Sequence, residues 1–152
     1  MARPTSLAFR ALDAQVIAGR GEEVALRDAD GCLTTAQLLH ESAVVAGAWR
    51  LLGLQEGDGL RLDVSRRHEV IAVLAALRLQ LDCGAPAAPA LLAGRPPVVS
   101  LGGEDVPWDA LIQLGRTDPL PAPAVDAPFV EAWASRHDDL LAPLLRGEEI
   151  VF

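Results

Sequence analysis

The chain is organised around a block of apolar-periodic segments between residues 24 and 85. In the first half of this block, apolar side chains recur at helical spacing on one face: Leu38, Val45, Trp49 and Leu52. The Thr34 hydroxyl can cap this helix, and Gln37 three residues later gives a near match to a capping box. Gly53 stands where a left-handed residue ends a helix. The pattern predicts a helix that begins at Thr34 and ends at Gly53.

The second half of the block predicts a turn, a strand and a second helix. Residues 55–59 are rich in glycine and polar side chains and favour a turn. Leu60, Leu62 and Val64 then alternate with charged residues, which indicates a short strand with one wet face. Ser65 can cap a helix from Arg66 to about Leu81, with Gly84 after its end. The apolar stripe of this helix is Val70, Val73, Leu74 and Leu77.

The segments on either side of this block extend the same pattern. In residues 5–19 the apolar positions recur at the spacing of an amphipathic helix, which predicts a short helix capped by Thr5 or Ser6. Residues 24–27 and 32–33 are expected to pair as a hairpin across a polar turn. Residues 86–126 are rich in proline, which excludes a continuous helix. Within them we expect a buried strand at residues 98–101 and a brief helix from Asp105 or Pro107.

The last segment, residues 127–152, predicts a helix and an apolar tail. Asp126 can cap this helix with Pro128 in its first turn, and Pro143 is expected to kink or split it. The tail is either a terminal strand or a segment that docks on a partner. We expect eight residues to form the interface in the second case: Trp133, Leu140, Leu141, Leu144, Leu145, Ile150, Val151 and Phe152.

The order hairpin, helix, turn, strand and helix predicts an α/β fold. We expect a small mixed, partly parallel sheet with helices on its faces. At 152 residues, 51% of them hydrophobic, the chain is expected to form a single domain spanning residues 1–152. Residues 5–85 would be its best-defined part.

Composition narrows the class of protein. A net charge of −8 argues against nucleic acid and anionic membrane surfaces as partners. Two cysteines, Cys32 and Cys83, are too few for a disulfide framework. No apolar run approaches the length of a membrane span or of a signal sequence core, so we expect a cytoplasmic protein.

Several short motifs follow one another along the chain in the same order as in a known protein family. Residues 33–38 read LTTAQL, residues 51–54 read LLGL, residues 57–58 read GD, residues 75–78 read AALR and residues 84–85 read GA. This run resembles the N-terminal subdomain of the adenylate-forming superfamily, which includes acyl-CoA synthetases, nonribosomal adenylation domains and luciferases. The resemblance implies the fold of that subdomain. The matched positions mark helix ends and turns and carry no chemistry themselves.

The chemical motifs of that family are missing here. The resemblance implies a phosphate loop, rich in small residues and ending in lysine, after residues 126–130. Residues 131–139 instead read EAWASRHDD, with three carboxylates that would repel a triphosphate. All thirteen basic residues of the chain are arginine, so the lysine that serves catalysis in the family is also missing. We therefore expect no cofactor and no activity of the chain on its own.

Other arrangements of reactive side chains are weak. The three histidines and two cysteines lack metal-ligand spacing, so we expect no metal site. Ser135, His137 and Asp138 are neighbours in sequence, whereas catalytic triads are assembled from distant segments. Arg66 and Arg67 could meet an anion at a helix start, although exposed arginines are the plainer interpretation. The sequence thus offers no catalytic or cofactor-binding residue.

These observations lead to three hypotheses. The first is a truncated, non-catalytic homologue, a pseudoenzyme that acts as an accessory or interaction protein, for example in natural product biosynthesis. It would form a homodimer or bind a partner protein through about 1,000 Å² per side. The second is the front fragment of an adenylating ligase that a second chain completes. The third is a small module that binds an acyl ligand in a cavity beside the second helix and the strand at residues 98–101.

Overall fold

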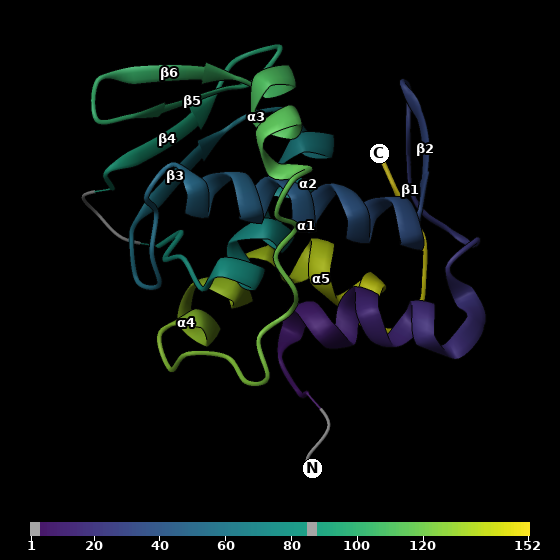
Figure 1. The fold of residues 1–152 in the computed structure, drawn as a ribbon. Helices are drawn as coiled ribbons and strands as arrows, with labels where there is room; N and C mark the ends of the chain where they lie inside the picture. The colour runs from purple at the N-terminus through teal and green to yellow at the C-terminus, as the bar shows by residue number, and fades with distance from the viewer. Residues whose placement is uncertain (1–3, 85–87) are drawn as a thin grey trace.

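The protein is a mixed α/β structure with two small sheets and helices packed between and around them (Figure 1). The structure is a computed structural model that describes residues 4–84 and 88–152. One sheet has the strand order β2-β1-β7 and the other has the order β3-β4-β5-β6. Both sheets contain parallel and antiparallel pairs, as expected for the fold class. The sequence predicted one sheet, whereas the chain forms two.

The first sheet joins the two ends of the chain. Strands β1 (Val24–Asp28) and β2 (Gly31–Thr34) form the expected antiparallel hairpin. Strand β7 (Ile150–Val151) lies parallel to β1, with Ile150 opposite Leu26. The Phe152 amide donates to the Arg27 carbonyl at 3.0 Å. The apolar tail is therefore a terminal strand, which was one of its two interpretations.

The second sheet contains two strands that the sequence did not predict. Strand β3 (Leu60–Asp63) lies parallel to β4 (Ala90–Ala93), and β5 (Val98–Leu101) pairs antiparallel with β4 and with β6 (Glu104–Pro107). Strands β3 and β5 confirm the prediction. Strand β6 has a polar, proline-ended sequence that strand propensity disfavours. The two-glycine turn before it, with φ of 60° and 82° at Gly102 and Gly103, returns the chain to the sheet.

The central helices agree with the sequence pattern except at one end. Helix α1 (Thr35–Leu51) has the Thr34–Gln37 capping box, and Gly53 follows it with a φ of 103°. Helix α2 (Arg66–Leu79) ends earlier than expected, because Gln80 takes the left-handed conformation instead of Gly84. Ser65 precedes α2, but its hydroxyl makes no capping bond. Helix α3 (Trp108–Gly115) begins after Pro107, as expected.

The first helical segment is unusual because two stretches of it are π-helical, η1 (Phe9–Asp13) and η2 (Val16–Arg20). The Ser6 hydroxyl accepts from the Phe9 amide at 3.3 Å, which confirms the expected cap. Asp126 also caps this segment, since its Oδ2 accepts from the Leu7 amide at 3.0 Å. The prediction that Asp126 caps the last helix is therefore wrong.

The C-terminal segment follows an extended connector, residues 116–129, and folds as three consecutive helical pieces. These are α4 (Val130–Ala134), the short 3₁₀ helix η3 (Ser135–His137) and α5 (Asp138–Leu145). The helix divides at η3, whereas Pro143 lies inside α5. The break therefore lies at η3, several residues before the position expected at Pro143. Pro143 has no N–H to donate to the Asp139 carbonyl, so it removes one helical hydrogen bond without dividing α5.

The core is centred on α2, whose residues 70–79 are all buried. Helix α1 packs against both α2 and α3, and α5 packs against η1 (Figure 1). The buried side chains of both sheets and all these helices belong to one hydrophobic cluster. Among the described residues no helix is both long and apolar enough to cross a bilayer. Ala85, half of the motif at residues 84–85, lies outside the described residues.

Candidate functional site

Residues 126–139 occupy the place where the resemblance implies a phosphate loop. They fold as the end of the connector followed by α4 and η3, and α5 begins at Asp138. Trp133 and Ala134 turn into the core, with 2% and 4% of their surfaces exposed. A phosphate loop works through free backbone N–H groups that converge on the anion. Here the segment is helical and packed, and its exposed side chains include Glu131, Asp138 and Asp139.

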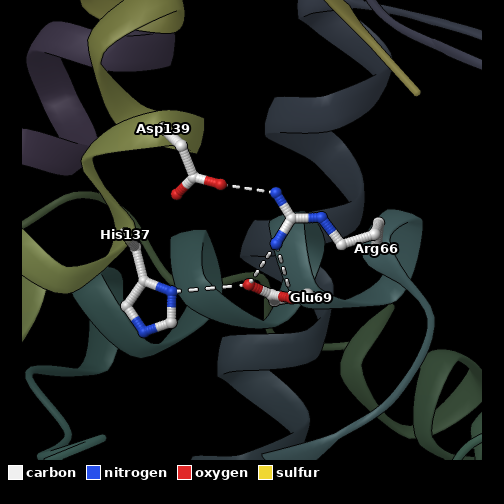
Figure 2. A network of polar contacts seen from close by, with 4 residues as sticks. All are labelled: Arg66, Glu69, His137 and Asp139. Carbon is white, nitrogen blue, oxygen red and sulfur yellow. Dashed lines mark hydrogen bonds and ion pairs between the residues drawn. The ribbon is translucent and has the colours of Figure 1, made fainter.

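Four charged or titratable side chains connect this segment to the start of α2 (Figure 2). Arg66 Nη1 lies 3.2 and 3.3 Å from the two carboxylate oxygens of Glu69. Arg66 Nη2 donates to Asp139 Oδ2 on α5. His137 Nδ1 lies 3.5 Å from Glu69 Oε1. The network therefore joins α2, η3 and α5 on the surface of the molecule (Figure 2).

The electrostatics of this network are those of an exposed structural contact. The hydrogen bond from Arg66 lowers the pKa of the Asp139 carboxyl and raises the pKa of the guanidinium. The two side chains are 48% and 56% exposed, so solvent screens their attraction. Such pairs contribute roughly 0–1 kcal/mol to stability. The network positions the C-terminal helices against α2.

Ser135, His137 and Asp138 are not arranged as a triad. The Ser135 hydroxyl donates to the Ala132 carbonyl at 3.2 Å. The ring of His137 makes an edge-on contact with Trp133, with centroids 5.9 Å apart, and its Nδ1 faces Glu69. A serine nucleophile requires its hydroxyl to donate to the histidine. Ser135 and His137 therefore point to different partners.

Arg66 and Arg67 lie at the edge of a surface hollow of ≈ 240 Å³, beside Arg95 and Phe152. Arg67 Nη1 donates to Asp28 Oδ1 at 2.8 Å and to the Gly31 carbonyl at 3.3 Å, which holds α2 against the β1–β2 hairpin. The Arg66 guanidinium stacks over the Phe152 ring, 4.9 Å from its centroid. Both arginines thus have partners within the chain, which supports the interpretation that they are structural.

The cysteines and histidines are dispersed. Burial raises the pKa of the Cys83 thiol to about 12, so it stays protonated and unreactive at neutral pH. Cys32 is exposed, and the two cysteines are not bonded to each other. Across residues 4–84 and 88–152 no three His, Cys, Asp or Glu side chains are grouped as metal ligands would be.

The eight expected interface residues have different surroundings. Trp133, Leu140, Leu141, Leu144 and Ile150 are 1–5% exposed and pack inside the chain's own core. Leu145 is partly buried, while Val151 and Phe152 are 65% and 43% exposed. Only these last three have surface available to a partner. That a partner contacts this region stays a prediction.

Two buried polar residues, one in the last turn of α2 and one directly after it, were not expected from the sequence. Arg78 is 4% exposed and bonds the Leu120 carbonyl at 2.8 Å and Asp13 Oδ1 at 2.8 Å. Gln80 is 5% exposed, and its Oε1 accepts from the Ala127 amide. Together they fasten the first helical segment and the connector to α2. A lone arginine inside an otherwise apolar run was the signal for Arg78.

Comparison with known proteins gives matches among solved structures alone, since no protein-family model and no curated protein sequence matches the chain. An anthranilate CoA ligase in complex with anthranoyl-AMP aligns with a TM-score of 0.47 at 18% identity, over 53% of this chain and 15% of the ligase. A coronafacic acid ligase from Pectobacterium brasiliense aligns with a TM-score of 0.47 at 12% identity, over 51% and 15% of the two chains.

A third similar structure is unliganded o-succinylbenzoate CoA synthetase from Bacillus subtilis. It aligns with a TM-score of 0.43 at 26% identity, over 52% of this chain and 16% of the synthetase. All three neighbours are ligases, and each is matched over about half of this chain. The aligned regions amount to only 15–16% of the ligases' own lengths.

Proposed function

We propose that this chain is a non-catalytic accessory protein, built on part of the adenylate-forming fold, which acts by binding another protein in a pathway that uses adenylation. The observation that carries the proposal is the conformation of residues 126–139. Residues 130–139 of this segment form packed helix, with Trp133 in the core and three carboxylates among the outward side chains. An ATP triphosphate would meet negative charge there and find no backbone cradle.

The residues shared with the family pattern support a structural role. Thr34 caps α1, Gly53 ends its last turn and Gly57 takes a φ of 87° in the next turn. Arg78 fastens the connector and the first helical segment to α2. These residues hold the chain in shape. The pattern therefore accounts for folding without implying chemistry.

The proposal is tested by titrating the purified chain with MgATP in a calorimeter and by following its unfolding temperature. We expect neither binding heat nor a rise in unfolding temperature at millimolar ATP, because a ligand stabilises only a state that binds it. MgGTP serves as the control for weak ionic contacts. Saturable binding of ATP, together with a higher unfolding temperature that GTP does not produce, would contradict the proposal. That result would favour a ligase fragment that a second chain completes.

A further inference from the structure

A groove runs between the start of the first helical segment and the C-terminal helices. It consists of two hollows of ≈ 190 and ≈ 340 Å³, and Leu7 and Glu131 belong to the walls of both. The first helical segment contributes Leu7 and Arg10 to one side. The opposite side comes from α4, η3 and α5. The groove is thus bounded by two helical walls.

The wall formed by α4, η3 and α5 carries a regular stripe. Its members follow one another at spacings of three, four, three and four residues, and all of them line the groove: Glu131, Ala134, Asp138, Leu141 and Leu145. This spacing places side chains on one face, the arrangement with which one helix packs against another. Ala134 and Leu141 are buried, whereas Leu145 and Leu7 are only partly buried. The apolar surface open to an occupant therefore comes from Leu145 and Leu7, and it lies beside the acidic positions of the stripe.

The charges of the groove are unbalanced. Glu131 and Asp138 are exposed and take part in no ion pair among the described residues. Asp126 adds a third carboxylate, and its buried Oδ1 accepts no hydrogen bond within the described part of the chain. Arg10 brings one positive charge, and its Nε donates to the Thr5 carbonyl. An occupant of this groove must supply positive charge.

We propose that the groove docks an amphipathic helix of a partner protein, with apolar side chains at 3-4 spacing and basic side chains on either side of them. This proposal rests on the interaction role proposed above and names the class of partner. The partner helix would lie along the wall formed by α4, η3 and α5, with Glu131 at one end of the stripe and Leu145 at the other. A second copy docked groove to groove would bring two acidic grooves together, and like charges repel.

The test uses two fluorescein-labelled peptides of about 18 residues, each with leucines at 3-4 spacing. One peptide carries lysine and arginine beside the leucines, and the other carries glutamate at the same positions. We expect the full chain to raise the fluorescence anisotropy of the basic peptide saturably, and to bind the acidic peptide at least tenfold more weakly. Added salt should weaken the binding, because it screens the ionic contacts.

Two charge-reversed variants with the same net charge locate the site. The groove variant, Glu131→Lys with Asp138→Lys, should bind the basic peptide at least tenfold more weakly than the wild type. The control variant, Glu104→Lys with Asp109→Lys, changes exposed residues of β6 and α3 and should stay within twofold of the wild type. Circular dichroism checks that both variants remain folded.

Three outcomes would overturn the docking proposal. They are equal binding of the two peptides, equal losses in the two variants, and absence of binding by the basic peptide. Light scattering could also show a dimer that the Leu145→Ala substitution dissociates. That result would mean that a second copy of the chain occupies the groove, and it would contradict the proposal as well. Each of these results leaves the MgATP titration unchanged. Failure of the docking proposal is therefore distinguishable from failure of the non-catalytic role.

Discussion

At the scale of single residues, the chain places its titratable groups where they serve packing. His68 illustrates this, since its ring lies edge-on to Trp108 with centroids 5.0 Å apart. Its Nδ1 lies 3.0 Å from the Ser65 hydroxyl oxygen. Burial is the main cause that lowers the pKa of His68, and the charges of Arg67 and Arg95 lower it further. Asp30 and Asp28 oppose this shift but do not reverse it. The surroundings of His68 therefore favour the neutral imidazole.

The lowered pKa of His68 predicts a pH dependence of stability. Since the folded-state pKa lies below the unfolded value, the unfolded chain takes up a proton first as the pH falls. The contribution is fully present above about pH 6.5 and is lost as the pH falls toward the folded-state pKa. In urea unfolding at about pH 7.5 and pH 5.5, we expect His68→Gln to lose less stability on acidification than the wild type. His40→Gln, which changes an exposed histidine, is the control. Equal losses in His68→Gln and the wild type would contradict this account.

At the scale of elements, two close backbone approaches fix how α1 meets α3 and the connector. A Cβ atom on Gly115 would lie 1.8 Å from the Val44 carbonyl oxygen. One on Gly47 would lie 1.9 Å from the carbonyl oxygen of Asp118. Both contacts are with backbone, which cannot move aside as a flexible side chain would. The two glycines therefore set the distance between these elements.

Replacing Gly115 with alanine should destabilise the fold. The added methyl group forces α3 away from α1, and we expect a loss of about 3 kcal/mol in the free energy of unfolding. Gly21→Ala is the matched control, because its φ is −60° and the nearest atom to an added Cβ is 3.5 Å away. It should change stability by less than about 1 kcal/mol. Urea unfolding of both variants measures these changes in unfolding free energy. Similar losses in the two variants would show that the close approach of α3 to α1 does not require glycine at position 115.

The elements also show what a sequence pattern can predict. Helices α1 and α2, the first hairpin and strands β3 and β5 were predicted because their periodicity and end signals agree locally. Strands β4 and β6 escaped prediction because neither has the alternating or β-branched pattern of a strand, and the neighbouring strands of the sheet supply their pairing. Asp126 was assigned to the wrong helix because the Leu7 amide, its actual partner, lies far away in sequence.

The candidate site was less predictable than the fold. The absence of a phosphate-loop composition was visible in residues 131–139, and these residues are indeed helical. The core position of Trp133 was not visible, because its sequence neighbours are mostly polar while its contacts come from other elements. The groove beside Leu7 arises where segments distant in sequence meet. No local pattern reports such a junction.

At the scale of the whole molecule, one buried ion pair connects three separate segments. Arg78 on α2 bonds Asp13 in the first helical segment and the carbonyl of Leu120 in the connector. The side chain of Arg78 is 2% exposed and that of Asp13 is 21% exposed. Removing one partner of such a pair leaves a desolvated charge without compensation. The pair therefore holds the N-terminal and central parts of the chain together.

Replacing Arg78 with leucine should cost about 3 kcal/mol of unfolding free energy. The loss follows because the partly buried Asp13 carboxylate and the Leu120 carbonyl would lose their donor. Arg50→Leu removes the exposed pair with Asp118, in which both side chains are 43% exposed, and should cost less than about 1 kcal/mol. Urea denaturation of the two variants measures both losses of unfolding free energy. A smaller loss for Arg78→Leu than for Arg50→Leu would contradict the structural role of Arg78.

The most direct test of the whole account is a titration of the ¹⁵N-labelled chain followed by two-dimensional NMR, first with MgATP and then with the basic amphipathic peptide. The account predicts that MgATP leaves the amide signals of residues 126–139 in place. It predicts that the peptide shifts the signals of Leu7, Ala134, Leu141 and Leu145. Saturable shifts at residues 126–139 with MgATP, and none along the groove with the peptide, would show instead that the chain binds nucleotide and not a partner helix.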